Sequence, residues 1–232
     1  GQSFEMIINK EGRCIRHCPP TEDMKAKVPE QMTPLDEIEP FSLYFNPGEP
    51  EPSNSQSLLE YSYLEEFAEL VRQRDRFYEY EVMQQQQEQP PSGSIRRAIN
   101  KDRVDRFFAT QVQGNYDQFN KALESISAYL RNSSGVVEIT LRGYAVPSNT
   151  TSTYKLLMAR ARTAAVRNTI LEYDDGVLRQ YIDADRLRIN QEALGEPQLD
   201  IKLRSQIESE SNPFNLTALL QSKVEVIIRF AD

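Results

Sequence analysis

The residues whose types could carry chemistry in this sequence are few, and most are aspartates beside turns. Asp174 and Asp175 are adjacent, and Asp183 and Asp185 are two positions apart, each pair at a predicted helix end or turn. Aspartate is ordinary there as a capping or turn residue. The single histidine, His17, lies in a segment without periodic pattern. A catalytic triad that uses histidine as the general base for its nucleophile therefore has no credible base. No glycine-rich phosphate loop is present, and we expect a protein that is not an enzyme and uses no cofactor.

The two cysteines, Cys14 and Cys18, flank His17. Structural zinc takes about four protein ligands, and this segment offers only these three without a second cluster elsewhere in the sequence. We therefore expect no metal site. A disulfide in an oxidising compartment and a pair of free thiols both stay open.

Arg162 is the most informative charged residue. It lies on or beside the face of a predicted helix that also carries Tyr154, Met158 and Ala165. A guanidinium held against a sheet is costly unless it is paired, and its planar fork suits a carboxylate. Two interpretations follow from the residues alone. Arg162 forms an internal salt bridge to a glutamate, or it captures a carboxylate-bearing ligand beside the strand end at residues 143–145.

The elements that would position Arg162 follow from hydrophobic periodicity. Alternating apolar residues predict strands, and apolar residues at three- and four-residue steps predict helices. The Gln- and Pro-rich stretch 83–94 and the polar stretch 194–212 predict surface loops. The predicted strands are 38–45, 136–142, a shorter one around 187–189, and 223–230, and the predicted helices are 57–80, 102–130, 153–173 and 213–220.

This order of elements predicts an α+β fold, a mixed sheet with helices packed on one face. Residues 1–36 read as an irregular lead-in broken by prolines. Residues 37–232 form one domain, with a helical and low-complexity insertion at about 46–100.

The composition excludes several partners. The chain has 232 residues and a formal net charge of −8 without a basic run, which argues against nucleic acid. No apolar run approaches the roughly 18 residues needed to cross a bilayer. The start carries no signal-peptide pattern, so we expect either a processed chain or a fragment of a larger protein.

The segment ITLRGYAVPSNTTSTYKLLMARARTAAVRNTI, residues 139–170, resembles the OmpA C-terminal-like domain family in the variant common in Bacteroidota. In that variant a strand ends in Gly-Tyr-Ala-Ser-Pro, and a helix with Tyr-Asn-x-x-Leu-Ser-x-x-Arg follows. FSLYFNPGEPEP and KVEVIIRF are similar to the family's first and last strands. The matching positions are Gly143, Tyr144, Ala145, Pro147, Tyr154, Arg162, Val166 and Asn168.

The resemblance implies a periplasmic, outer-membrane-associated domain that binds the diaminopimelate stem peptide of peptidoglycan. In the family a loop aspartate binds the ammonium, the helix arginine binds a carboxylate, and a helix asparagine and loop N–H groups complete the site. The inserted helix is similar to that of a type IX secretion subunit ending in such a domain, which implies other envelope and secretion subunits as partners. The implied peptidoglycan-binding residues here are Arg162, Tyr144, Ala145, Val146, Tyr154, Lys155 and Lys223.

The sequence departs from the family pattern at most charged positions. Val146 or Pro147 stands at the acidic position of the loop, and Lys155 replaces the helix asparagine. Ala159 replaces a serine, and Ser222 and Lys223 replace the arginine pair of the last strand. Arg162 is retained.

Two hypotheses therefore stay open. In the first, the domain anchors an envelope-spanning assembly to peptidoglycan, and Arg162→Ala abolishes retention on purified sacculi with a nearly unchanged melting temperature. In the second, the site is degenerate, and the domain is a scaffold that binds partner proteins and not peptidoglycan.

Overall fold

The computed structural model describes residues 7–8, 14–16, 38–51, 61–88, 101–146, 150–198 and 213–231. The chain divides into two units, residues 1–35 and 36–232. The first contains a short antiparallel pair, β1 (Ile7–Ile8) and β2 (Cys14–Arg16), in a segment expected to be irregular. Strands of two and three residues are too short to show an alternating pattern. His17 and Cys18 lie outside the described residues, so the cysteine interpretation stays a prediction.

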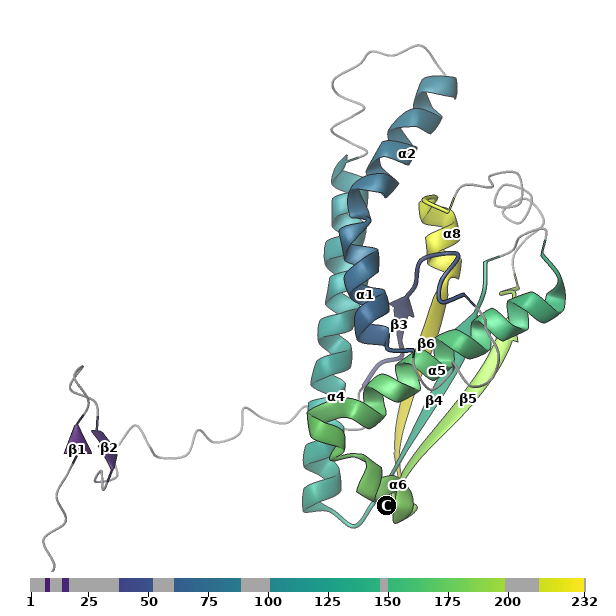
Figure 1. Ribbon diagram of the computed structural model, residues 1–232. Helices are drawn as coiled ribbons and strands as arrows, with labels where there is room; N and C mark the ends of the chain where they lie inside the picture. The colour runs from purple at the N-terminus through teal and green to yellow at the C-terminus, as the bar shows by residue number, and fades with distance from the viewer. Residues whose placement is uncertain are drawn as a thin grey trace, which may run out of the picture. The chain divides into compact units, whose positions relative to one another are not determined.

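The second unit is built on a four-stranded mixed sheet (Figure 1). Its strands are β3 (Phe41–Tyr44), β4 (Val136–Tyr144), β5 (Leu187–Gly195) and β6 (Lys223–Ala231), in the order β3-β6-β4-β5. Neighbours are antiparallel except β4 and β5, which are parallel. A parallel pair needs a crossover connection, which α5 (Ser152–Gly176) provides. The predicted α+β class is confirmed.

One face of the sheet carries the core. In β4 the side chains of Val137, Ile139 and Leu141 are buried, while those between them are half-buried. In β6, Val224 and Val226 continue the apolar face. α5 crosses this face, and α4 (Gly114–Asn132) packs beside it (Figure 1). Strict alternation thus places one face under helices and the other toward solvent.

The helices of the predicted insertion and the helical residues 101–113 that follow it form a helical layer that extends past the sheet (Figure 1). It comprises α1 (Tyr63–Arg72), α2 (Arg74–Glu88), helical residues 101–107 and a π-helical segment, η4 (Phe108–Gln113), that leads into α4. Aromatic rings join α1 and α2 to η4 and α4: the ring centroids of Phe67 and Tyr116 are 4.0 Å apart in a stack, and those of Phe77 and Phe108 are 5.6 Å apart.

Several predicted boundaries were wrong. The helix expected over 57–80 is two helices separated at Gln73, and residues 52–60 lie outside the described part. The loop expected from Met83 is helical through Glu88, because glutamine is a good helix former and continues a helix already begun; residues 89–94 are not described. β5 is longer than expected and includes Leu194 and Gly195, so the predicted loop starts later.

Two short helices complete the unit, α6 (Arg179–Asp183) and α8 (Leu216–Gln221). Asn215 caps α8 by accepting a hydrogen bond from the N–H of Thr217 at 2.7 Å. Within the ranges that the structure describes, no helix has the length and apolar character of a membrane span.

Candidate functional site at the end of strand β4

The predicted site gathers where β4 ends against α5, and Arg162 lies at its centre. Thr151 caps α5 by accepting a hydrogen bond from the N–H of Tyr154 at 3.2 Å, which fixes the start of the helix. Gly143 lets the helix approach closely, since a Cβ there would lie 2.4 Å from the carbonyl oxygen of Ala159. This close crossing brings the Arg162 side chain to the strand end.

Arg162 is fully buried, with 0% of its surface exposed. Its Nη1 donates to the carbonyl of Tyr144 at 2.6 Å, and its Nε donates to the carbonyl of Glu49 at 2.9 Å. Its Nη2 donates to the carbonyls of Asn46 and Pro47 at 3.0 and 3.3 Å. Both interpretations drawn from the sequence placed a carboxylate, from a glutamate or from a ligand, against the Arg162 guanidinium. The hydrogen-bonded partners are instead four backbone carbonyls.

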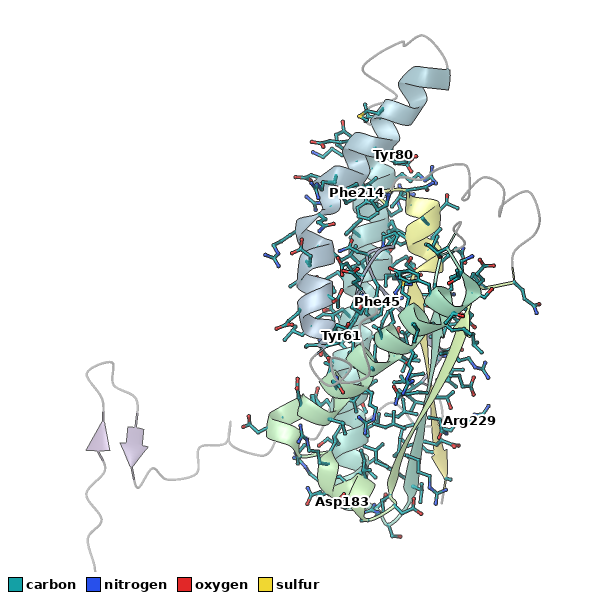
Figure 2. All side chains as sticks on the ribbon, turned by 45° about the vertical axis from the view of Figure 1, so that its right-hand side comes forward. Phe45, Tyr61, Tyr80, Asp183, Phe214 and Arg229 are labelled. Carbon is teal, nitrogen blue, oxygen red and sulfur yellow. The ribbon has the colours of Figure 1, made fainter. Side chains whose placement is uncertain are left out.

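These carbonyls belong mainly to the turn after β3. The N–H of Phe45 donates to the carbonyl of Ser222, and the N–H of Glu49 donates to the carbonyl of Asn46, which closes the turn. The guanidinium also lies over the Phe45 ring, at 5.6 Å from its centroid. Phe45 itself is buried between the sheet and the helical layer (Figure 2). Arg162 therefore holds the turn of residues 46–49 against the end of β4.

Carboxylates surround this arginine without a direct hydrogen bond to it among the described contacts. Burial lowers the pKa of Arg162, and the negative charges of Glu66 and Glu49 oppose that shift. Burial and the neighbouring Glu49 raise the pKa of Glu66 to about 7, while Arg162 lowers it. The charges of Glu66 and Arg162 thus favour each other through space, while burial disfavours the ionised form of both groups.

Glu66 is a participant that sequence reasoning missed. It lies on α1, in the helix that hydrophobic periodicity predicts, but nothing in its sequence context distinguishes it from Glu65 or Glu69. Asn46 was also missed. The residue is 5% exposed, and neither atom of its side-chain amide has a hydrogen-bond partner among the residues that the structure describes. The signal available for Asn46 was its place directly after the first predicted strand.

The two predicted lysines of the site are paired with glutamates. Lys155 is buried and forms an ion pair with Glu196, just beyond β5. Lys223 donates to Glu225 at 2.8 Å, and its ammonium lies 5.6 Å from the centroid of the Tyr144 ring. The structure thus provides each cation of the predicted site with internal partners.

The remaining predicted residues line the strand end. Ala145 is buried, and its N–H donates to the carbonyl of Gly195 at 2.6 Å. Tyr144 and Val146 are half-buried, and the Tyr144 hydroxyl donates to Glu225 at 3.1 Å. Tyr154 is half-buried on the first turn of α5. Residues 147–149, which include the proline of the family pattern, lie outside the described part.

The aspartates considered for acid–base chemistry do not come together with this site. Asp174 forms an ion pair with Arg131 at 3.2 Å, and Asp185 forms one with Arg188 at 2.7 Å. Asp183 is the last residue of α6 and lies at the end of the unit opposite Tyr80 (Figure 2). Among the described residues, no three metal-ligating side chains are grouped in a way that could hold a metal ion.

The chain matches no protein-family model, no curated protein and no solved structure in the comparisons made with it.

Proposed function

We propose that this chain is a non-enzymatic scaffold domain of the bacterial cell envelope, on an OmpA C-terminal-like plan, that binds partner proteins and not peptidoglycan. The observation that carries this proposal is the state of Arg162, which is fully buried and donates four hydrogen bonds to backbone carbonyls. A ligand carboxylate would gain a bond to Arg162 only by stripping buried carbonyls of their donor, which costs free energy.

The two lysines support the same proposal. A stem peptide carries carboxylates, and at this strand end its carboxylates would compete with Glu196 for Lys155 and with Glu225 for Lys223. The pair of Lys155 with Glu196 is largely buried, at 11% and 18% exposed side-chain surface. Breaking a buried pair leaves an unpaired charge behind, so ligand binding gains little from this site.

The helical layer gives a positive reason for protein partners. α1, α2 and residues 101–113 add a surface that extends beyond the sheet (Figure 1). Large apolar side chains are exposed on its helices, among them Leu64 at 52%, Val71 at 40% and Met83 at 55%. Apolar area of this kind is what a protein–protein contact buries.

Anchoring of an envelope-spanning assembly to the peptidoglycan stem peptide is the second candidate. The observation that favours it is that Arg162, Tyr144 and Ala145, which match the family pattern, do meet at one corner. For this function the turn of residues 46–49 would move away and leave its hydrogen bonds to a ligand carboxylate. Both candidates place the chain in the periplasm, associated with the outer membrane.

Muramidase digestion separates the two candidates. Envelopes from cells that express the tagged chain are digested until the sacculus is soluble, and the chain is followed by immunoblotting. The scaffold predicts that the chain stays with membrane-bound partners in a complex that cross-linking recovers before and after digestion. Release of the chain together with soluble muropeptides contradicts the scaffold and supports the anchor.

A further inference from the structure

β5 is an edge strand of nine residues, and only one of its two hydrogen-bonding edges is paired in the described structure, with β4. The N–H of Val137 donates to the carbonyl of Arg186, which sets the phase of the parallel ladder. The backbone groups of Arg188, Asn190 and Glu192 therefore face β4. Those of Leu187, Ile189, Gln191 and Ala193 point outward, and no described element pairs with them.

Natural edge strands are blunted by proline, short length, bulges or a covering element, and charged side chains on the edge also discourage pairing unless the incoming strand places opposite charges against them. β3, at the opposite edge, has four residues. β5 (LRINQEALG) has no proline, and its one irregularity lies at the end near Gly195. Its outer edge is therefore a template for another strand.

We propose that two copies of this chain pair antiparallel through the outer edges of β5, which joins their sheets into one continuous sheet. With Asn190 on the two-fold axis, the outward backbone N–H and C=O groups of Leu187 form hydrogen bonds with those of Ala193 of the second copy. Those of Ile189 meet Gln191 of the second copy in the same way. Every outward group of these four residues then has a partner, and helices stay on the same face in both copies.

Charge complementarity favours this register of the two β5 strands. It also favours a second copy of the chain as the partner that pairs with the outer edge of β5. Arg188 of each copy then lies opposite Glu192 of the other, which forms two opposite-charge pairs across the axis. A slip by one position of the axis in either direction places Arg188 opposite Asn190 or Leu194 of the second copy. Arg188 and Glu192 now pair with Asp185 and Arg142 at the exposed surface, and such pairs are weak enough to be shared.

Gln191 provides the first test, because its N–H points outward and its replacement leaves the ladder to β4 intact. Proline at this position removes the outward donor, whereas alanine keeps it. Light scattering at about 100 μM protein, well above a micromolar Kd, measures the mass. Wild type and Gln191→Ala should have twice the 26.7 kDa of one chain, and Gln191→Pro should be a monomer with an unchanged circular dichroism spectrum.

Charge reversal tests the register. Arg188→Glu and Glu192→Arg each place two like-charge pairs across the axis and should weaken self-association by about tenfold or more. An equimolar mixture of the two variants should form a heterodimer, and a chain with both substitutions should again form a homodimer. A monomeric wild type, or a dimer that survives both Gln191→Pro and the single charge reversals, overturns the proposal.

Discussion

Replacing Arg162 with alanine should destabilise the fold strongly, which a ligand-binding arginine at an open site would not do. The substitution removes the Arg162 donors from four backbone carbonyls and leaves a cavity where a fully buried side chain stood. The Asn46 carbonyl still accepts from the Glu49 N–H, so the other three carbonyls lose their donor. A buried acceptor without a donor costs about 1 kcal/mol or more, so three of them give at least about 3 kcal/mol. Loss of one partner from a buried charged cluster independently gives about 3–5 kcal/mol.

A loss of about 4 kcal/mol is a large part of the about 5–15 kcal/mol that stabilises an ordinary domain. For a domain of this size, about 1 kcal/mol corresponds to about 2–4 °C in Tm, so the expected decrease is about 8–16 °C. Thermal unfolding followed by circular dichroism measures it. Arg160 is exposed two positions earlier on α5, and Arg160→Ala is the matched control, with an expected change within about 0.5 kcal/mol.

Arg162→Lys distinguishes hydrogen bonding from charge. The lysine keeps the cation, but its compact ammonium cannot reach four carbonyls that the planar guanidinium holds at 2.6–3.3 Å. We expect this variant to melt between wild type and Arg162→Ala. If Arg162→Ala melts within about 1 °C of Arg160→Ala, the carbonyl cluster carries no stability and the reasoning is refuted.

Three further predictions use other parts of the second unit. Burial raises the pKa of Glu66 to about 7 from 4.5, so its contribution to stability is full below pH 4.5 and is lost as pH rises through about 7. Solvent screening reduces that loss to about 1 kcal/mol, and Glu66→Gln should flatten the urea-unfolding free energy between pH 5 and 8, measured against wild type. Gly143→Ala should cost about 1–3 kcal/mol in chemical denaturation because its Cβ meets the Ala159 carbonyl at 2.4 Å, whereas Gly48→Ala, with no atom within 4 Å, should be neutral. Asn215→Ala should cost about 1 kcal/mol in the same assay by removing the cap of α8, and an unchanged midpoint would contradict that role.

The sequence was sufficient to predict an element and its buried face where a single hydrophobic period runs through the whole element. β4 alternates through Val137, Ile139 and Leu141, and burial follows the same alternation, so strand, face and layer were predictable together. The position of Arg162 beside the buried face of α5 was predictable for the same reason. These elements were enough to place the chain in the α+β class.

The partners of Arg162 were beyond local pattern. They are main-chain oxygens, which every residue carries, and Asn46 is 116 positions away in the sequence. A search for complementary side chains therefore pointed to a carboxylate. The continuation of α2 past Met83 escapes prediction for a different reason. Low hydrophobicity is typical of loops, but the glutamines of this segment favour helix.

Sedimentation with purified sacculi tests the central claim most directly, because it asks for peptidoglycan binding with no other envelope component present. The folded wild-type chain is mixed with insoluble peptidoglycan, and a peptidoglycan-binding domain of established activity serves as the positive control. Lys155→Ala is tested in parallel as a site variant that leaves Arg162 and its carbonyls in place. We expect both chains to stay in the supernatant while the control sediments. Saturable sedimentation of the wild type that Lys155→Ala weakens would contradict the proposal that the domain is a scaffold without peptidoglycan binding. It would show instead that the strand end at residues 144–146 binds peptidoglycan.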